Sequence, residues 1–190
     1  MKTKWSILIP STEIRRGMTM ELVDEFLDQI ESNNLNGIVE VVTLFDNGES
    51  SIGKKRNELM ELAKGEYISF FDSDDKPSNV YVSKCMEGIS QGVDCCSLKG
   101  VITWDGTKPE LFEHSLKYNE YKTTENDIKY ERYPNHLNCI KKSLIFDFKF
   151  PEINHGEDTD FATQIHKANV LKNEYYIEEI MYHYKFLTSK

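Results

Sequence analysis

Short apolar runs and helical repeats alternate along the first third of the chain. The runs at 6–10, 38–45 and 67–71 have the length and the β-branched or aromatic content of buried strands. Between them, apolar residues recur every three or four positions around 23–30 and after Gly53, which predicts two amphipathic helices. A strand, helix, strand, helix, strand order favours right-handed crossovers and a parallel sheet.

The two predicted helices each have one apolar face, and the second has a clear stop signal. Gly65 follows the basic Lys64, and a glycine in this place commonly ends a helix in the left-handed conformation. We therefore expect a positive φ at Gly65. The apolar faces comprise Val23, Phe26, Leu27 and Ile30 in the first helix and Leu59, Leu62 and Ala63 in the second.

The pattern is weaker in the second half of the chain. Residues 82–89 repeat as an amphipathic helix, and 93–104 are typical of a strand that ends at Asp105-Gly106, a hairpin signal. The stretch 107–126 is polar and weakly patterned, and we assign it no role.

A helix and a strand are predicted near the end of the sequence. Gly156 precedes acidic residues that open the helix, and acidic residues in a first turn are often only complements to the helix dipole. Residues 175–186 predict the final strand. One side of this strand carries Tyr182, Tyr184 and Phe186, and the other side carries His183 and Lys185.

Composition indicates one soluble domain. With 190 residues, 39% of them hydrophobic, the chain can bury roughly 70% of the surface that its unfolded form exposes, so we expect a single domain over 1–190. The net charge of −9 argues against a sequence-independent grip on nucleic acid. No apolar run has the length of a transmembrane segment and no signal segment precedes the first strand, so we expect a cytoplasmic protein.

The four cysteines have no Cys-x-x-Cys spacing. Cys95 and Cys96 are adjacent in a predicted strand, so their side chains should point to opposite faces. We expect all four to be reduced thiols in the core.

Three carboxylates follow the apolar run at 67–71. If the extended conformation continues, strand alternation places Asp72 and Asp74 on one side and Ser73 on the other. Two carboxylates this close repel each other unless one takes a proton or a cation lies between them. Oxygen ligands of this kind suit Mg²⁺ or Mn²⁺, which complete their shells with water and substrate phosphates.

Two other interpretations of this turn stay open. Aspartates ahead of a helix are often solvated turn residues, with Asp75 or Ser78 as the helix cap. Phosphohydrolases of the haloacid dehalogenase class also place Asp-x-Asp after an apolar strand, normally the first strand of the domain. A calcium loop of the EF-hand type is excluded, because the sixth position from Asp72 is Pro77 and the twelfth is Ser83.

In a parallel sheet, ligands bind outside the carboxyl ends of the strands. Thr12, Asp46 and the acidic turn at 72–75 each follow a predicted strand. We therefore expect these residues to meet at one edge of the sheet.

With these pieces in order, nearly the whole sequence resembles the family 2 glycosyltransferases of the GT-A fold. The resemblance rests on the opening Ser-Ile-Leu-Ile-Pro-Ser at 6–11, an aspartate-glycine turn near Asp46 and the pair Arg56-Asn57. It continues through Ala-Lys-Gly-Glu-Tyr-Ile-Ser-Phe-Phe-Asp-Ser-Asp-Asp at 63–75 and ends with Gly-Glu-Asp at 156–158.

The resemblance implies a single domain with a mixed, mainly parallel sheet flanked by helices. Residues 1–100 would bind the nucleotide sugar, and 101–190 would bind the acceptor and supply the catalytic base. The implied activity is a metal-dependent, inverting transfer from a nucleotide diphosphate sugar, such as a UDP-sugar, to a hydroxyl of a carbohydrate or glycolipid. A silent nucleotide-sugar-binding protein is the alternative.

The resemblance also implies a role for particular residues. Asp158 would be the catalytic base, and Asp46 would contact the nucleobase. Asp72 and Asp74 would bind Mn²⁺ or Mg²⁺ on the diphosphate, with His183 as a further ligand. The donor-binding set implied in this way is Pro10, Thr12, Glu13, Asp46, Arg56, Asp72, Ser73 and Asp74.

Overall fold

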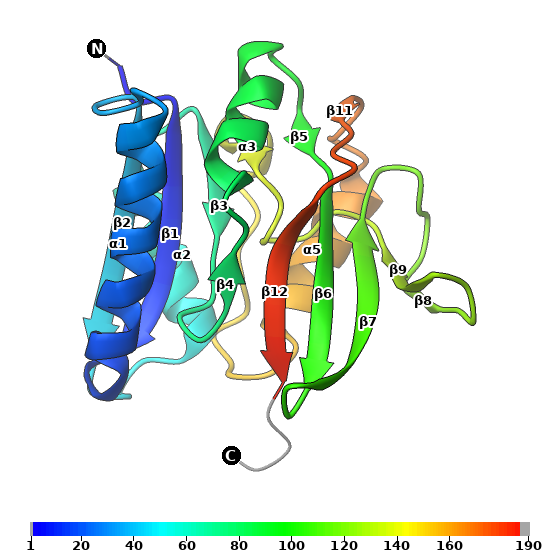
Figure 1. Ribbon diagram of the computed structural model, residues 1–190, viewed down its shortest axis with the longest axis horizontal. Helices are drawn as coiled ribbons and strands as arrows, with labels where there is room; N and C mark the ends of the chain where they lie inside the picture. Colours follow the sequence, from blue (N-terminus) through cyan, green and yellow to red (C-terminus); the bar gives the residue numbers. More distant parts are fainter. Residues whose placement is uncertain (1, 187–190) are drawn as a thin grey trace.

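Two six-stranded sheets organise the computed structural model, which describes residues 2–186 (Figure 1). The first sheet has the strand order β11-β5-β10-β3-β1-β2, in which β1 pairs in parallel with both β2 and β3. β10 pairs antiparallel with β3 and with β5. The strands of this sheet are β1 (Trp5–Thr12), β2 (Val39–Asp46), β3 (Tyr67–Phe70), β5 (Cys95–Cys96), β10 (Ile140–Lys141) and β11 (Glu174–Tyr175).

The second sheet has the order β4-β12-β6-β7-β9-β8. β12 runs parallel to β6, while β6 and β7 form an antiparallel hairpin. Its strands are β4 (Lys76–Pro77), β6 (Leu98–Trp104), β7 (Thr107–His114), β8 (Lys122–Thr123), β9 (Ile128–Arg132) and β12 (Ile180–Phe186).

Helices lie on both faces of the first sheet, with α1 and α3 in front and α2 and α5 behind (Figure 1). The alternation of β1 supplies both interfaces, since Ile7 and Ile9 pack in one buried cluster and Leu8 packs in the other. The helices are the 3-10 helix η1 (Glu13–Arg15), α1 (Arg16–Ser32), α2 (Ile52–Leu62), α3 (Tyr81–Ser90), α4 (Lys142–Ile145) and α5 (Glu157–Ala168).

The predicted mixed α/β fold in one domain is confirmed, with the strands divided between two sheets. The division splits both long predicted strands. Residues 93–104 contain β5 and β6, and 175–186 contain the end of β11 and all of β12, in each case one strand per sheet. Ser97 lies at the first break, where its Oγ accepts the Ile177 N–H at 2.7 Å and its N–H donates to Tyr175 O. Ser97 therefore bonds to the end of β11 and to the segment between β11 and β12 instead of continuing β5 into β6.

The hairpin signal and the cysteine prediction are also confirmed. Asp105 and Gly106 connect β6 and β7 with φ values of 49° and 75°. Cys95 packs in one buried cluster and Cys96 in the other, and both are free thiols. The stretch 107–126, to which the sequence assigned no role, contains β7 and β8.

The expected positive φ at Gly65 is wrong. α2 ends earlier, at Leu62, and Ala63 is already extended with φ −60° and ψ 129°. Gly65 does not appear among the residues with positive φ. A Cβ on Gly65 would lie 2.6 Å from the backbone nitrogen of Ser6, so glycine is required here by the close approach of β1.

Two predicted core positions on the helices are also wrong. Leu27 is 47% exposed and Leu62 is 54% exposed. Leu22 and Met60 are buried instead, because the buried stripes of α1 and α2 are rotated relative to the predicted faces. Among residues 2–186, no helix is long and apolar enough to cross a bilayer.

Candidate active site

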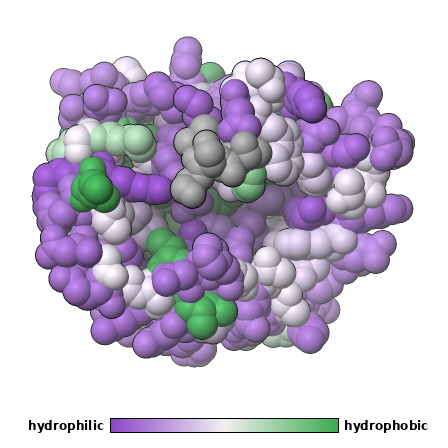
Figure 2. Space-filling model, turned by 90° about the horizontal axis from the view of Figure 1, so that it is seen from below, coloured by the Kyte–Doolittle hydropathy of each residue, from purple (hydrophilic) through white to green (hydrophobic). Residues whose placement is uncertain are grey.

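The carboxyl ends of β1, β2 and β3 lie at the same edge of the first sheet, as expected (Figure 1). Thr12 and Asp46 are directly opposite each other in the β1–β2 register. Seen from this end, the surface is mainly hydrophilic and is hollowed near its centre (Figure 2). The predicted donor residues Pro10, Thr12, Glu13, Asp46, Arg56, Asp72, Ser73 and Asp74 all belong to the segments that meet at this end.

Asp72 and Asp74 do not lie on one side of an extended strand, so that prediction is wrong. β3 ends at Phe70, and the Asp75 N–H donates to Asp72 O at 3.2 Å, which closes a turn. Because of the turn, the two carboxylates point in different directions and pair with different arginine side chains. Asp72 Oδ1 lies 2.9 Å from Arg56 Nη2, and Asp74 Oδ2 lies 3.2 Å from Arg15 Nη1.

The other two residues of the turn are buried. Ser73 Oγ accepts a long 3.5 Å hydrogen bond from Arg15. Asp75 accepts from the Tyr182 hydroxyl at 2.7 Å and from the Lys185 N–H at 3.0 Å, both on β12. Burial and the neighbouring Asp72 carboxylate raise the pKa of Asp75 to about 8. Asp75 therefore fastens the turn to the second sheet, a role that the sequence did not indicate.

The Asp46 carboxylate, predicted to contact a nucleobase, is held by a lysine and by backbone amides. Lys55 Nζ lies 2.8 Å from Asp46 Oδ1 and donates also to Ser11 O at 2.9 Å. Burial alone would raise the pKa of Asp46, but the Lys55 ammonium and the N–H groups of Ser50 and Gly48 outweigh it and lower that pKa. The sequence missed Lys55, although it is adjacent to the predicted Arg56.

Pro10 and Glu13, near the end of β1 and just after it, differ in their exposure to solvent. Pro10 is buried within β1. Glu13 is solvent-exposed and pairs with Arg16, whose Nη2 lies 2.6 Å from Glu13 Oε1. The Arg16 guanidinium also lies 4.0 Å from the centre of the Phe45 ring. A planar cation therefore covers an aromatic ring beside the Asp46 end of β2.

The three acidic residues in the first turn of α5 have three different environments. Gly156, with φ +83°, begins the helix in a conformation that favours glycine. Glu157 is buried and hydrogen-bonds to Arg56, while Asp160 accepts from Gln164. Asp158 instead lines a cavity of about 460 Å³ together with Asp72.

Arg56 therefore joins the acidic turn to α5. Its side chain is 4% exposed and contacts both Asp72 and Glu157. Its guanidinium also lies 5.6 Å from the centre of the buried Phe150 ring. Because both carboxylates are bonded to one rigid fork, their relative position is fixed.

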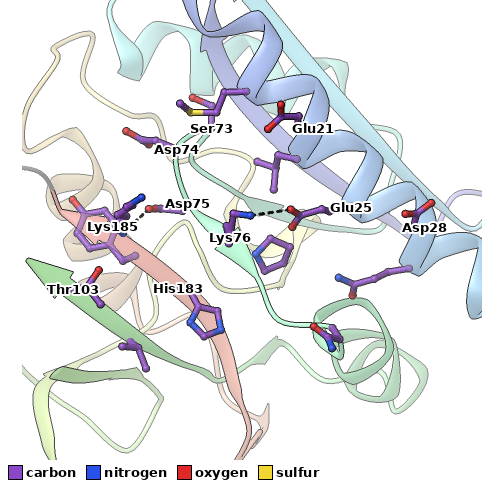
Figure 3. A pocket seen from close by; sticks show the side chains of 17 residues that line it. Glu21, Glu25, Asp28, Ser73, Asp74, Asp75, Lys76, Thr103, His183 and Lys185 are labelled. Carbon is purple, nitrogen blue, oxygen red and sulfur yellow. Dashed lines mark hydrogen bonds and ion pairs between the residues drawn. The ribbon is translucent and has the colours of Figure 1, made fainter. Parts of the chain in front are cut away.

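A larger cavity of about 1050 Å³ lies between α1 and the β4 and β12 strands, and Asp74 and His183 both line it (Figure 3). The two side chains come from different elements and are well separated in this view. Lys76 lies between them and α1, where it pairs with Glu25 at 3.3 Å. The structure thus places His183 in the same cavity as Asp74, but not beside it.

The donor atoms of the turn are of the type that Mg²⁺ and Mn²⁺ prefer. Within residues 2–186, however, no group of three or more His, Cys, Asp or Glu side chains is arranged to hold a metal. A divalent ion can take one carboxylate and complete its shell with substrate phosphates and water. Asp72 and Asp74 line different cavities, so an ion held by both would require Asp72 to leave Arg56 and Asp74 to leave Arg15.

Solved structures with the same arrangement of elements are glycosyltransferases. Residues 1–349 of S. aureus TarS match with a TM-score of 0.62 at 16% identity, over 96% of this chain and 60% of that one. The same fragment in complex with UDP-GlcNAc matches with a TM-score of 0.61 at 15% identity, over 99% and 60%. This chain has the GT-A fold.

A second kind of transferase supports the same fold. The catalytic domain of Drosophila β1,4-galactosyltransferase 7, in complex with xylobiose, matches with a TM-score of 0.56 at 12% identity, over 94% of this chain and 66% of that one. No protein-family model matches the sequence, and no curated protein has a detectably similar sequence. The chain spans about 60% of the length of the TarS fragment.

Proposed function

We propose that this chain is a metal-dependent, inverting glycosyltransferase that moves a sugar from a nucleotide diphosphate sugar to an acceptor hydroxyl in polysaccharide or glycoconjugate synthesis. The observation that carries the proposal is that Asp158 and Asp72 line one cavity although they are 86 positions apart (158 − 72). A base and a donor-binding carboxylate must face the same reacting centre in such a transfer. UDP is the nucleotide we favour, because the TarS fragment was crystallised with UDP and with UDP-GlcNAc.

In this proposal Asp158 removes the proton from the acceptor hydroxyl. The hydroxyl oxygen then forms a bond to the anomeric carbon on the face opposite the diphosphate, and the bond from that carbon to the diphosphate oxygen breaks. A direct displacement of this kind inverts the anomeric centre. Asp158 is suited to the role because it lines the cavity and the hydrogen bond that its side chain accepts, from Thr159 Oγ1 at 3.4 Å, is long. In contrast, Glu157 is bonded to Arg56 and Asp160 to Gln164.

The donor would lie across the carboxyl ends of β1 to β3. We assign the nucleobase to the region of Asp46 and the Phe45–Arg16 pair and the diphosphate to the acidic turn, because these groups lie at the ends of β2 and β3. A bound Mn²⁺ or Mg²⁺, held by Asp72 and Asp74 with His183 as a candidate third ligand, would neutralise the charge that develops on the leaving diphosphate. Arg15 is the second cation available to that charge.

The alternative of a silent nucleotide-sugar-binding protein has one observation in its favour. Both carboxylates of the turn are already paired, Asp72 with Arg56 and Asp74 with Arg15. A site that keeps these pairs could bind a nucleotide sugar without turnover. The phosphohydrolase interpretation has no such support, because the acidic turn follows β3 of a GT-A fold.

The test is a panel of nucleotide sugars with and without Mn²⁺. We expect UDP to raise the melting temperature by roughly 5 to 10 °C at about 100 times its dissociation constant, and only with the metal present. We also expect one UDP-sugar to release UDP slowly by hydrolysis and faster with an acceptor. Binding without any UDP release would favour the silent protein, and release of inorganic phosphate alone would contradict both.

A further inference from the structure

The cavity of about 460 Å³ that Asp72 and Asp158 line also has an arginine side chain in its wall. Arg132, at the end of β9, lines it together with Trp104 and Tyr130. Arg132 and Tyr130 are two positions apart, so strand alternation turns both to the same face. The cavity that holds Asp72 and Asp158 therefore has a guanidinium and aromatic rings in its wall.

This guanidinium lacks an acidic partner within residues 2–186. Both of its hydrogen bonds come from Nη1, which donates to Lys122 O at 2.6 Å and Glu131 O at 2.8 Å. Nε and Nη2 make no hydrogen bond with the described residues, and no carboxylate there lies within 4.0 Å. Burial lowers the pKa of Arg132, as expected for a partly desolvated cation without a counter-charge.

Other side chains in the wall of the same cavity also have polar atoms without a hydrogen bond to the described residues. Among residues 2–186, Tyr121 Oη, His114 Nδ1 and both ring nitrogens of His136 are buried and make no hydrogen bond. His114 is 6% exposed and His136 is 5% exposed, and both line the cavity, as does Tyr121. Buried polar atoms are nearly always hydrogen-bonded to protein or to ordered water, so these groups leave hydrogen-bonding capacity in the wall of the cavity for water or for a polar ligand.

The rings beside Arg132 suit the flat face of a sugar. Trp104 and Phe186 pack with ring centres 4.6 Å apart, and both line the cavity. Tyr130 is held by a 2.7 Å hydrogen bond to Glu110, which also accepts from Trp104 Nε1 at 3.2 Å. The Trp104 and Tyr130 rings are therefore fixed in place before any ligand binds.

We propose that this cavity takes a sugar that carries an anionic group, a carboxylate or a phosphate, and that Arg132 selects it. The free N–H groups of Arg132 can form the paired hydrogen bonds that guanidinium makes with such anions. The identity of the ligand as a sugar rests on the proposed function. The anion belongs either to the transferred sugar of the donor or to the acceptor, since both must lie near Asp158.

Binding of small glycosides tests the anion preference without requiring turnover. The probes are methyl β-glucuronide, methyl β-glucoside 6-phosphate and the neutral methyl β-glucoside, with Trp104 fluorescence as the readout. We expect at least one charged glycoside to bind about 10- to 100-fold more tightly than the neutral one. The preference should decrease as salt is added, because salt screens the attraction between the anion and Arg132. This measurement needs no variant.

Turnover with matched donors and acceptors distinguishes the two sources. If the anion is on the donor, UDP-glucuronate should be hydrolysed faster than UDP-glucose. If it is on the acceptor, the charged glycoside should accelerate UDP release from an active donor more than the neutral glycoside does. Loss of all UDP release, with the glycoside preference intact, would reject the proposed function and leave the anion site.

Arg132→Gln should abolish the preference, and Arg132→Lys should keep part of it because the charge remains without the fork. Lys129→Gln is the matched control, since Lys129 is on the same strand but outside the cavity, and the preference should not change. The proposal is overturned if no charged probe is preferred over its neutral twin in either assay. It is overturned equally if the preference survives in a folded Arg132→Gln variant.

Discussion

Asp72 and Glu157 share one guanidinium, that of Arg56, although they belong to the acidic turn and to α5. The arginine side chain is 4% exposed, and those of Asp72 and Glu157 are 30% and 7% exposed. The acidic turn and the helix that carries Asp158 are thus held at a fixed distance by a largely buried ion-pair triad.

Removal of Arg56 should destabilise the fold. Arg56→Gln leaves Glu157 buried without a counter-charge, which typically costs about 3 to 5 kcal/mol of unfolding free energy. Urea denaturation monitored by circular dichroism measures the change. Arg16→Gln is the control, because the Arg16–Glu13 pair is exposed and should not alter the midpoint measurably. Equal midpoints for the two variants would show that the triad does not stabilise the fold.

Asp75 should make the protein less stable as the pH rises. Its folded pKa of about 8 is above the unfolded value of about 3.9, so the folded state holds the proton more tightly. The stabilisation is complete below about pH 4 and is lost between about pH 4 and pH 8. Denaturation between pH 5 and 8, with EDTA present, should show this fall in the parent protein.

Asp75→Asn provides the comparison for that pH profile. The amide can still accept from the Lys185 N–H and can donate to the Tyr182 hydroxyl, so the two contacts to β12 survive. We expect a flatter stability profile between pH 5 and 8 than in the parent protein. If parent and variant lose stability in parallel, another group is responsible for the titration.

The first half of the fold was predictable because its local signals agree. The strands β1, β2 and β3 are apolar runs bounded by polar turns, and the order of elements selects a parallel arrangement. The faces of α1 and α2 were harder, because Leu27 and Leu62 satisfy the helical repeat but are exposed in the fold. The break between β5 and β6 depends on two hydrogen bonds, from the Ser97 N–H to Tyr175 O and from the Ile177 N–H to Ser97 Oγ, which no local pattern encodes.

In the site, too, local sequence patterns identified some residues but not the contacts between them. Asp46, Asp72 and Asp158 could be selected because motifs identify residue types at the ends of strands and helices. Lys55, which pairs with Asp46, and Arg15, which pairs with Asp74, could not be selected, since they are recognised only by what they contact in space. The convergence of Asp72 and Asp74 failed as a prediction, because it assumed a continuing strand where the chain makes a turn.

Arg15 should compete with a metal ion for Asp74. Its Nη1 lies 3.2 Å from Asp74 Oδ2, and both side chains are partly exposed. Arg15→Ala should therefore strengthen Mn²⁺ binding up to about 5-fold, the range expected for a weak ion pair. Titration of Mn²⁺ by electron paramagnetic resonance, with UDP absent, measures it. Arg16→Ala is the control, and weaker Mn²⁺ binding in Arg15→Ala would argue against the competition.

His183 should contribute to metal binding only if it approaches Asp74 when the nucleotide is bound. Imidazole suits Mn²⁺ better than Mg²⁺, so His183→Ala should reduce UDP affinity in Mn²⁺ more than in Mg²⁺. Calorimetry measures the UDP affinity in Mn²⁺ and in Mg²⁺, and the ratio of the two affinities is compared between His183→Ala and the parent protein. Lys185→Ala, on the same side of β12, controls for general loss of charge in the cavity. Identical ratios in His183→Ala and in the parent protein would remove His183 from the metal site.

Asp158 should be the base whose loss stops transfer without weakening nucleotide binding. Asp158→Asn is nearly isosteric, and the loss of a positioned base typically lowers turnover about 10²- to 10⁴-fold. Asp160→Asn is the matched control, because Asp160 lies in the same helical turn but is exposed and bonded to Gln164. Glu157→Gln is a poorer control, since it also breaks the buried contact with Arg56. The measurements are the transfer rate and the UDP affinity of each variant. If Asp160→Asn abolishes transfer while Asp158→Asn does not, the base is wrongly assigned, and if both retain full rates no carboxylate at this helix end accepts the proton.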